Sequence, residues 1–163
     1  MRSKTAKWFE CKVRYEQVQP DGTAKKVTEM YVVDALSFSE AERRITEEML
    51  AYISGEFEVV GIKPAQYCDV QFVSAEQQEN ADTRWYKAKL QFITIDEKTG
   101  KEKKQNVTYL VQGRSLRNAL DNVDKVMKGT MIDYIQANVG ETQIIDVFEH
   151  EESNADGDGN EQQ

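Results

Sequence analysis

Apolar and charged side chains alternate between residues 8 and 15, which predicts a β-strand with one buried face. The apolar positions of this strand are Phe9, Cys11, Val13 and Tyr15. Pro20-Asp21-Gly22 then predicts a turn, because proline fixes φ and glycine permits a positive φ. Residues 27–33 return as a second strand, so this part of the chain is expected to form a β-hairpin.

The spacing of apolar residues then changes to that of a helix. Ser37, with Glu40 three residues later, has the pattern of a capping box at a helix N-terminus. The predicted apolar face has spacings of 3 and 4 and consists of Phe38, Ala41, Ile45, Met49 and Tyr52. Gly55 is expected to end the helix. Residues 56–62 and 66–73 are expected to form two further strands, separated by Pro64.

The same order of elements recurs about 77 residues later. Residues 8–13 correspond to 85–90, residues 31–33 to 109–111, and residues 62–70 to 139–147. Ser115 begins a second predicted helix, with the apolar face Leu116, Ala119, Leu120, Val123 and Met127. These matches predict an α+β protein with an internally duplicated ββαββ unit, made of antiparallel sheets with one helix per repeat. Two unrelated α+β segments with similar strand patterns are the alternative.

The predicted core includes one face of each helix. We expect almost complete burial of Phe38, Ile45, Leu116, Leu120 and Val123.

The repeats are expected at residues 1–73 and 85–150, joined by a polar linker at 74–84. Charge is concentrated at the C-terminal end, because the segment from Glu149 onward contains no Lys or Arg. Its acidic residues are Glu149, Glu151, Glu152, Asp156, Asp158 and Glu161. Residues 151–163 are therefore expected to form a disordered acidic tail. The net charge of −8 is mostly that of this tail, and the repeats themselves are near neutral.

Few residue types that carry catalysis are present, since the chain has 2 Cys and 1 His. There is no GxSxG, no HExxH and no Gly-rich phosphate loop. Cys11 and Cys68 are expected to be buried, reduced thiols, and His150 is expected to be solvated. We therefore expect no enzyme activity, no cofactor and no metal site. Asp69 and Asp146 correspond across the repeats and are expected to accept hydrogen bonds from backbone amides.

The hydropathy of the chain predicts a cytoplasmic protein without a membrane partner. No apolar run is long enough to cross a bilayer, and residues 1–10 lack the apolar segment of a secretory signal.

The outward side of the first strand in each repeat combines one aromatic residue with two cations. These residues are Trp8, Lys12 and Arg14 in one repeat and Trp85, Lys87 and Lys89 in the other. The second hairpin adds Lys101, Lys103 and Lys104. Single-stranded nucleic acid is bound by such sets, because bases stack on aromatic rings and cations contact phosphates.

Single-stranded nucleic-acid binding, with the acidic tail as a competitor, is accordingly the preferred prediction. The alternative is a protein-interaction or assembly module of unknown partner, homodimeric through an open sheet edge.

Six segments carry a family resemblance: WFECKVRYE, KVTEMYVVDALSFSEA, RWYKAKLQFITIDEKTGKEK, NVTYLV, GTMIDY and DVFEH. Through them the chain resembles an uncharacterised domain-of-unknown-function family of bacteria and their phages. This resemblance implies a phage-related protein and assigns no activity or functional residue. In architecture alone, the tandem units resemble the Whirly and transcriptional-coactivator class of single-stranded DNA-binding proteins, with the elements in permuted order.

Overall fold

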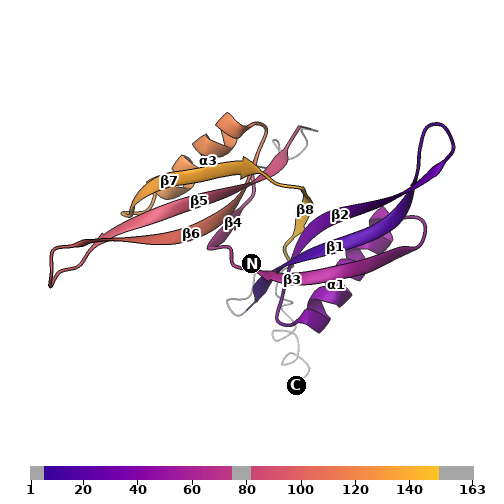
Figure 1. Ribbon diagram of the computed structural model, residues 1–163, viewed down its shortest axis with the longest axis horizontal. Coiled ribbons are helices and arrows are strands. Elements are labelled where there is room, and N and C mark those ends of the chain that lie inside the picture. Colours follow the sequence, from indigo (N-terminus) through magenta and orange to yellow (C-terminus); the bar gives the residue numbers. More distant parts are fainter. Residues whose placement is uncertain (1–5, 75–81, 151–163) are drawn as a thin grey trace, which may run out of the picture. The chain divides into compact units, whose positions relative to one another are not determined.

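The computed structural model describes residues 6–74 and 82–150, and their elements follow the predicted ββαββ order twice (Figure 1). The first repeat contains β1 (Lys7–Val18), β2 (Ala24–Ala35), α1 (Phe38–Tyr52), β3 (Phe57–Ala65) and β4 (Asp69–Gln71). The second contains β5 (Arg84–Ile95), β6 (Glu102–Gly113), α3 (Leu116–Lys128), β7 (Asp133–Glu141) and β8 (Ile144–Phe148). The predicted α+β duplication is thereby confirmed. Most of the predicted linker and the whole predicted tail lie outside the described residues.

Each repeat contributes its last strand to the sheet of the other repeat. The strand orders are β3-β1-β2-β8 and β4-β6-β5-β7. β4 pairs in parallel with β6, with Asp69 opposite Tyr109, so the prediction of antiparallel sheets is wrong for this pair. The first compact unit therefore combines the chain up to Ala65 with the chain from Asp146, and the second unit is Gln66–Ile145. Because of this exchange, the compact units do not coincide with the sequence repeats at 1–73 and 85–150.

The two long hairpins are built alike. β1 pairs with β2 from Lys7–Ala35 to Val18–Ala24, and β5 pairs with β6 from Arg84–Gly113 to Ile95–Glu102. Gly22 and Gly100 occupy the turns with φ of 86° and 69°, which only glycine adopts readily. β3 and β7 flank β1 and β5, and each of these pairings contains one register shift, after Lys12 and after Lys89. These bulges lie at equivalent positions of the two repeats and support the duplication.

Both helices begin with the same capping arrangement. Ser37 Oγ accepts a hydrogen bond from the Glu40 N–H at 3.1 Å, and the Glu40 carboxylate accepts one from the Leu36 N–H at 3.3 Å. Ser115 and Asn118 repeat this pattern, each accepting at 3.0 Å. The predicted cap at Ser37 is confirmed, although the return bond goes to the residue before the cap. The prediction that Gly55 ends the helix is wrong, because α1 ends at Tyr52 with Ile53 as its C-cap.

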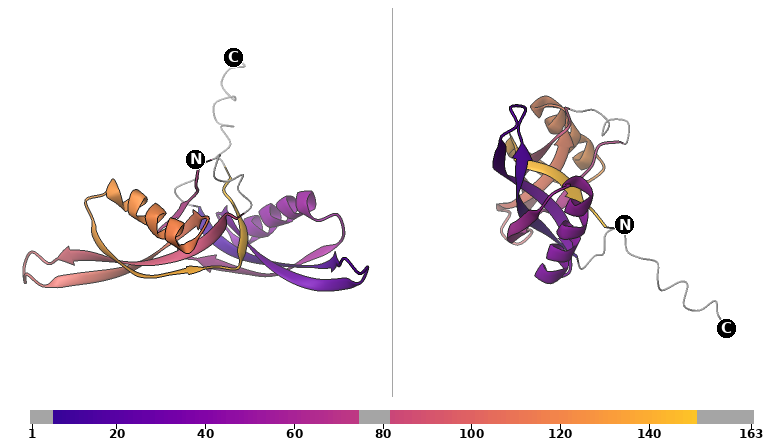
Figure 2. Two further views of the ribbon diagram at one scale, coloured as in Figure 1. Left: turned by 90° about the horizontal axis from the view of Figure 1, so that it is seen from above. Right: turned by 90° about the vertical axis from the view of Figure 1, so that its right-hand side faces the viewer.

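Each helix lies on one face of its own sheet (Figure 2). The buried helix positions are spaced four apart: Ala41, Ile45 and Met49 on α1, and Ala119, Val123 and Met127 on α3. Burial is thus confirmed for Ile45 and Val123. The prediction of burial is wrong for Phe38 and Leu116, which are 54% and 48% exposed.

Phe38, the first residue of α1, covers the margin of the core without entering it. Phe38 contacts Phe9 edge to face, with the ring centroids 5.1 Å apart, and remains exposed on its other side. Leu120 is half-buried, one position away from the buried Ala119. The apolar stripe of each helix is therefore narrower than its sequence pattern predicts.

Candidate nucleic-acid interface

The two tryptophans expected to stack on bases are buried. Trp8 and Trp85 are 3% and 2% exposed, and the residue that follows each of them, Phe9 or Tyr86, is buried too. Both faces of the strand are therefore covered at this end. Trp85 also contacts Phe72 edge to face, with the centroids 5.2 Å apart. The expectation that these tryptophans lie on a solvent-facing surface is wrong.

The first unit presents a charge-balanced face on the side of its sheet opposite α1. Residues directly opposite on neighbouring strands have Cβ atoms about 5 Å apart, so their charges offset one another. The opposed pairs on this face are Arg14 with Glu58, Glu16 with Lys26, and Glu10 with Lys63. Lys12 is exposed and has uncharged Met30 and Gly61 on its two sides.

On the corresponding face of the second unit, Lys89 has uncharged polar neighbours. The carboxylates of this face, Asp133 and Glu102, lie toward the hairpin tip, opposite Ile93 and Ile95. Lys89 lies between Thr108 of β6 and Asn138 of β7. Gln91 lies opposite Asn106, and its Nε2 donates a hydrogen bond to the Asn106 Oδ1 at 3.3 Å. Lys104 lies on the same face, two positions from Asn106 on β6. We call these residues the lysine face: Lys89, Gln91, Lys104, Asn106, Thr108 and Asn138.

The remaining predicted cations border the lysine face or lie away from it. Lys87 is on the same side of β5 but half-buried, and its ammonium lies 5.7 Å from the centre of the Tyr67 ring. Lys101 is exposed at the β5–β6 turn. Lys103 is on the other side of β6, where its Nζ lies 3.8 Å from the Asp96 carboxylate. Lys87, Lys89 and Lys104 are therefore the predicted site residues that share one face.

A buried acidic residue organises the first unit and was not predicted from the sequence. Asp34 is 1% exposed, and its Oδ1 accepts hydrogen bonds from Arg44 at 3.2 Å and from the His150 N–H at 3.0 Å. Nδ1 of His150 also lies 3.0 Å from this oxygen, and Nε2 lies 3.4 Å from the Glu48 carboxylate. The expectation that His150 is solvated is wrong. This cluster ties the chain after β8 to β2 and α1.

The two equivalent aspartates do what was predicted of them. Oδ1 of Asp69 accepts the Val70 N–H at 2.8 Å, and Oδ1 of Asp146 accepts the Val147 N–H at 2.8 Å. Burial raises the pKa of Asp146 above its usual value, against the smaller lowering by hydrogen bonds from Val147 and Tyr52. Asp69 begins β4 and Asp146 lies in the middle of β8, and each aspartate accepts the N–H of the residue that follows it.

The two cysteines differ in their surroundings. Cys11 is buried and unpaired, and burial raises the pKa of its thiol to about 12, with a further contribution from the Glu10 carboxylate. Cys68 is exposed, so the expectation of a buried thiol is wrong there. It precedes β4, and its N–H donates to the Thr108 carbonyl at 2.7 Å, which holds the backbone while the side chain faces water.

Within residues 6–74 and 82–150, no three His, Cys, Asp or Glu side chains are grouped so that they could hold a metal ion. The same ranges contain no helix that is both long enough and apolar enough to traverse a bilayer.

Comparison with known protein families matches residues 7–150 to a domain of unknown function, DUF4494. The match spans both repeats and confirms the family resemblance expected from the sequence. No curated protein matches the chain. The occurrence in bacteria and phages and the likeness to the Whirly class stay predictions.

Proposed function

The chain belongs to DUF4494, a family of unknown function, and we propose that it is a non-enzymatic protein that binds single-stranded nucleic acid on its lysine face. The observation that carries this proposal is the position of Lys89 between Thr108 and Asn138. An exposed cation with hydrogen-bonding neighbours on both sides suits a phosphate and the base attached to it.

The proposed division of roles follows from the side-chain chemistry. Lys89 and Lys104 are exposed and contact phosphates, with Lys87 adding positive charge at the edge of the face. The amides of Gln91 and Asn106 each carry donors and an acceptor, so they hydrogen-bond base edges without a strong sequence preference.

Binding in this mode depends on phosphate contacts more than on stacking. Trp8 and Trp85 are buried, so the contribution of about 1–3 kcal/mol per base that an aromatic platform supplies is not available from them. Affinity is then modest and falls steeply with salt, since each neutralised phosphate releases counterions. The acidic residues from Glu151 onward compete for the same cations, as proposed from the sequence.

The test compares the lysine face with the equivalent face of the first unit. Fluorescence anisotropy is measured with a labelled oligothymidylate of about 16 nucleotides, at about 50 mM and about 200 mM salt. The double variant Lys89→Ala/Lys104→Ala is compared with Lys12→Ala/Arg14→Ala, which removes the same number of charges from the first unit.

We expect the lysine-face variant to bind about tenfold more weakly and to lose about 1.4 units of salt slope, or ~0.7 for each lost phosphate contact. The control variant should change affinity less than about twofold. An equal loss of oligonucleotide affinity in the two double variants would contradict the proposal. So would absence of binding at low salt by protein truncated after His150.

A further inference from the structure

The first unit contains a short stretch of β1 that has a neighbour on one side only. Pairing between β3 and β1 starts at Phe57, opposite Tyr15, whereas β1 stays paired with β2 as far as Val18 and Ala24. On the side of β1 where β3 pairs with it, the described residues therefore place no strand beside residues 16–18. We call this unoccupied position next to β1 the open lane.

The backbone of this stretch has hydrogen-bonding groups directed into the open lane. The Gln19 N–H donates to the Thr23 carbonyl at 2.8 Å across the turn. Gln19 and Thr23 are therefore a hydrogen-bonded pair. Such pairs recur at every second residue of an antiparallel ladder, so Gln17, two residues before Gln19, also directs its N–H and C=O toward β2. Glu16 and Val18 consequently direct theirs away from β2, into the open lane.

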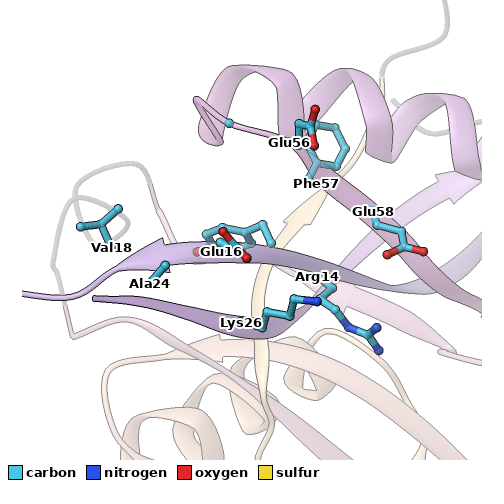
Figure 3. Close-up of a pocket in the computed structure, with 10 residues that line it drawn as sticks. Arg14, Glu16, Val18, Ala24, Lys26, Glu56, Phe57 and Glu58 are labelled. Atoms are coloured by element: carbon cyan, nitrogen blue, oxygen red, sulfur yellow. The ribbon is translucent and has the colours of Figure 1, made fainter. Parts of the chain in front are cut away.

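A cavity of about 580 Å³ occupies this position (Figure 3), within the range of roughly 300–1,000 Å³ that is typical of ligand pockets. Its apolar lining includes Val18 and Ala24 toward the hairpin tip and Phe57 at the start of β3. Val18 is 74% exposed, which leaves a β-branched side chain available for contact.

The charged lining has more carboxylates than cations. The carboxylates belong to Glu16, Glu56 and Glu58, and the cations to Arg14 and Lys26. Arg14 lies opposite Glu58, and Lys26 opposite Glu16. Glu56 precedes β3 and has no such cation opposite it, so the cavity has one carboxylate in excess.

We propose that this cavity binds an extended peptide that carries a lysine or arginine and pairs with β1 as an added strand. Its backbone hydrogen-bonds to Glu16 and Val18. The residue opposite Glu16 lies on the same face as that carboxylate and is basic, and the residue opposite Val18 is apolar. The peptide thus occupies the lane of β3 and continues the sheet toward the hairpin tip.

The second unit offers an internal comparison, because β7 pairs with β5 closer to the hairpin tip than β3 pairs with β1. β7 starts at Asp133, opposite Ile93. These positions are equivalent to Glu56 and Glu16 of the first repeat, where the pairing has already ended. The second unit therefore has one more residue pair between these strands, which leaves less of the edge of β5 than of β1 for an added strand. The cavity shares no residue with the lysine face.

The experiment follows backbone amide signals of the ¹⁵N-labelled full chain by NMR. The probe is the peptide acetyl-Thr-Val-Thr-Lys-amide, whose Val and Lys lie opposite Val18 and Glu16 in the proposed pairing. One control peptide has Glu in place of Lys, and a second has N-methylvaline in place of Val, which removes the N–H directed at Val18 and keeps the side chain. Spermidine serves as a small cation without a peptide backbone. We expect saturable shifts at Glu16–Val18 and Phe57–Glu58, and much smaller shifts at Ile93–Ile95.

The controls separate side-chain charge from strand pairing. The Glu and N-methylvaline peptides should each bind at least about fivefold more weakly than the probe. Glu16→Lys should weaken probe binding by a similar factor, whereas Gln17→Lys, whose side chain lies on the other face, should not. Equal binding of the N-methylvaline peptide, the same shifts with spermidine, or no shifts with the probe would each overturn the proposal.

Discussion

The backbone N–H and the Nδ1 atom of His150 both lie 3.0 Å from a single oxygen, Oδ1 of Asp34, which is 116 residues away in the chain. Asp34 is also held by Arg44, so a buried carboxylate has partners from α1 and from the segment after β8. This relationship fixes the exchanged strand β8 in the first unit by side-chain chemistry as well as by strand pairing.

His150→Ala should destabilise the protein by about 1–3 kcal/mol, because it removes a partner from a buried charged acceptor. Urea denaturation at neutral pH measures the change. Glu149→Ala, at an exposed neighbouring position, serves as the control and should be nearly neutral. Equal effects of the two substitutions would show that the contact with Asp34 contributes nothing specific.

Asp146 should make stability fall as the pH rises through its raised pKa. The folded protein holds the proton more tightly than the unfolded chain, whose aspartate has a pKa near 3.8. The native state therefore loses relative stability from about this pH upward until Asp146 is ionised in both states. Asp146→Asn should abolish this part of the pH profile and raise stability at neutral pH.

The matched control for that profile is Asp69→Asn, at the equivalent position of β4, where the aspartate is exposed. Thermal unfolding between about pH 4 and pH 8 measures both variants. A profile that changes equally in the two variants would contradict the assignment to Asp146.

One thiol should react with Ellman's reagent in the folded protein and two in denaturant. Cys68 is exposed, whereas Cys11 is buried with its pKa raised to about 12, and the thiolate is the reactive form. Cys68→Ser should abolish the native reaction and Cys11→Ser should leave it. Two fast thiols in the native protein would contradict the burial of Cys11.

Ile45→Ala should cost about 2–5 kcal/mol, because it leaves a cavity between α1 and its sheet. Phe38→Ala removes a larger side chain from the same helix but one that is 54% exposed, and it should cost less. Chemical denaturation of both variants gives the comparison. A larger loss for Phe38→Ala would mean that the buried face of α1 is assigned wrongly.

The helices and hairpins were predictable because caps, turns and the spacing of apolar residues are set by residues close together in the sequence. Ser37 and the spacing of Ile45 and Met49 predict α1 from adjacent residues alone, and the bulges after Lys12 and Lys89 agree with the duplication. The strand exchange was not predictable in this way. β4 and β8 both contain an Asp-Val pair, with a buried Val70 or Val147, so either strand suits either sheet.

The candidate site was predictable only in part, for a similar reason. Alternation correctly separates Phe9 and Cys11 from the opposite face of β1, but it cannot show that the opposite face is itself covered at Trp8. Likewise, no local pattern distinguishes Lys12, whose face is charge-balanced, from Lys89, whose neighbours are Thr108 and Asn138. That difference depends on which strands lie alongside.

The most direct test of nucleic-acid binding on the lysine face is an NMR titration of the labelled protein with oligothymidylate at low salt. Amide shifts should be largest at Lys89, Asn106 and Asn138, should weaken as salt is added, and should be small at Lys12 and Met30. Shifts concentrated on the first unit, or no shifts even in protein truncated after His150, would contradict the account.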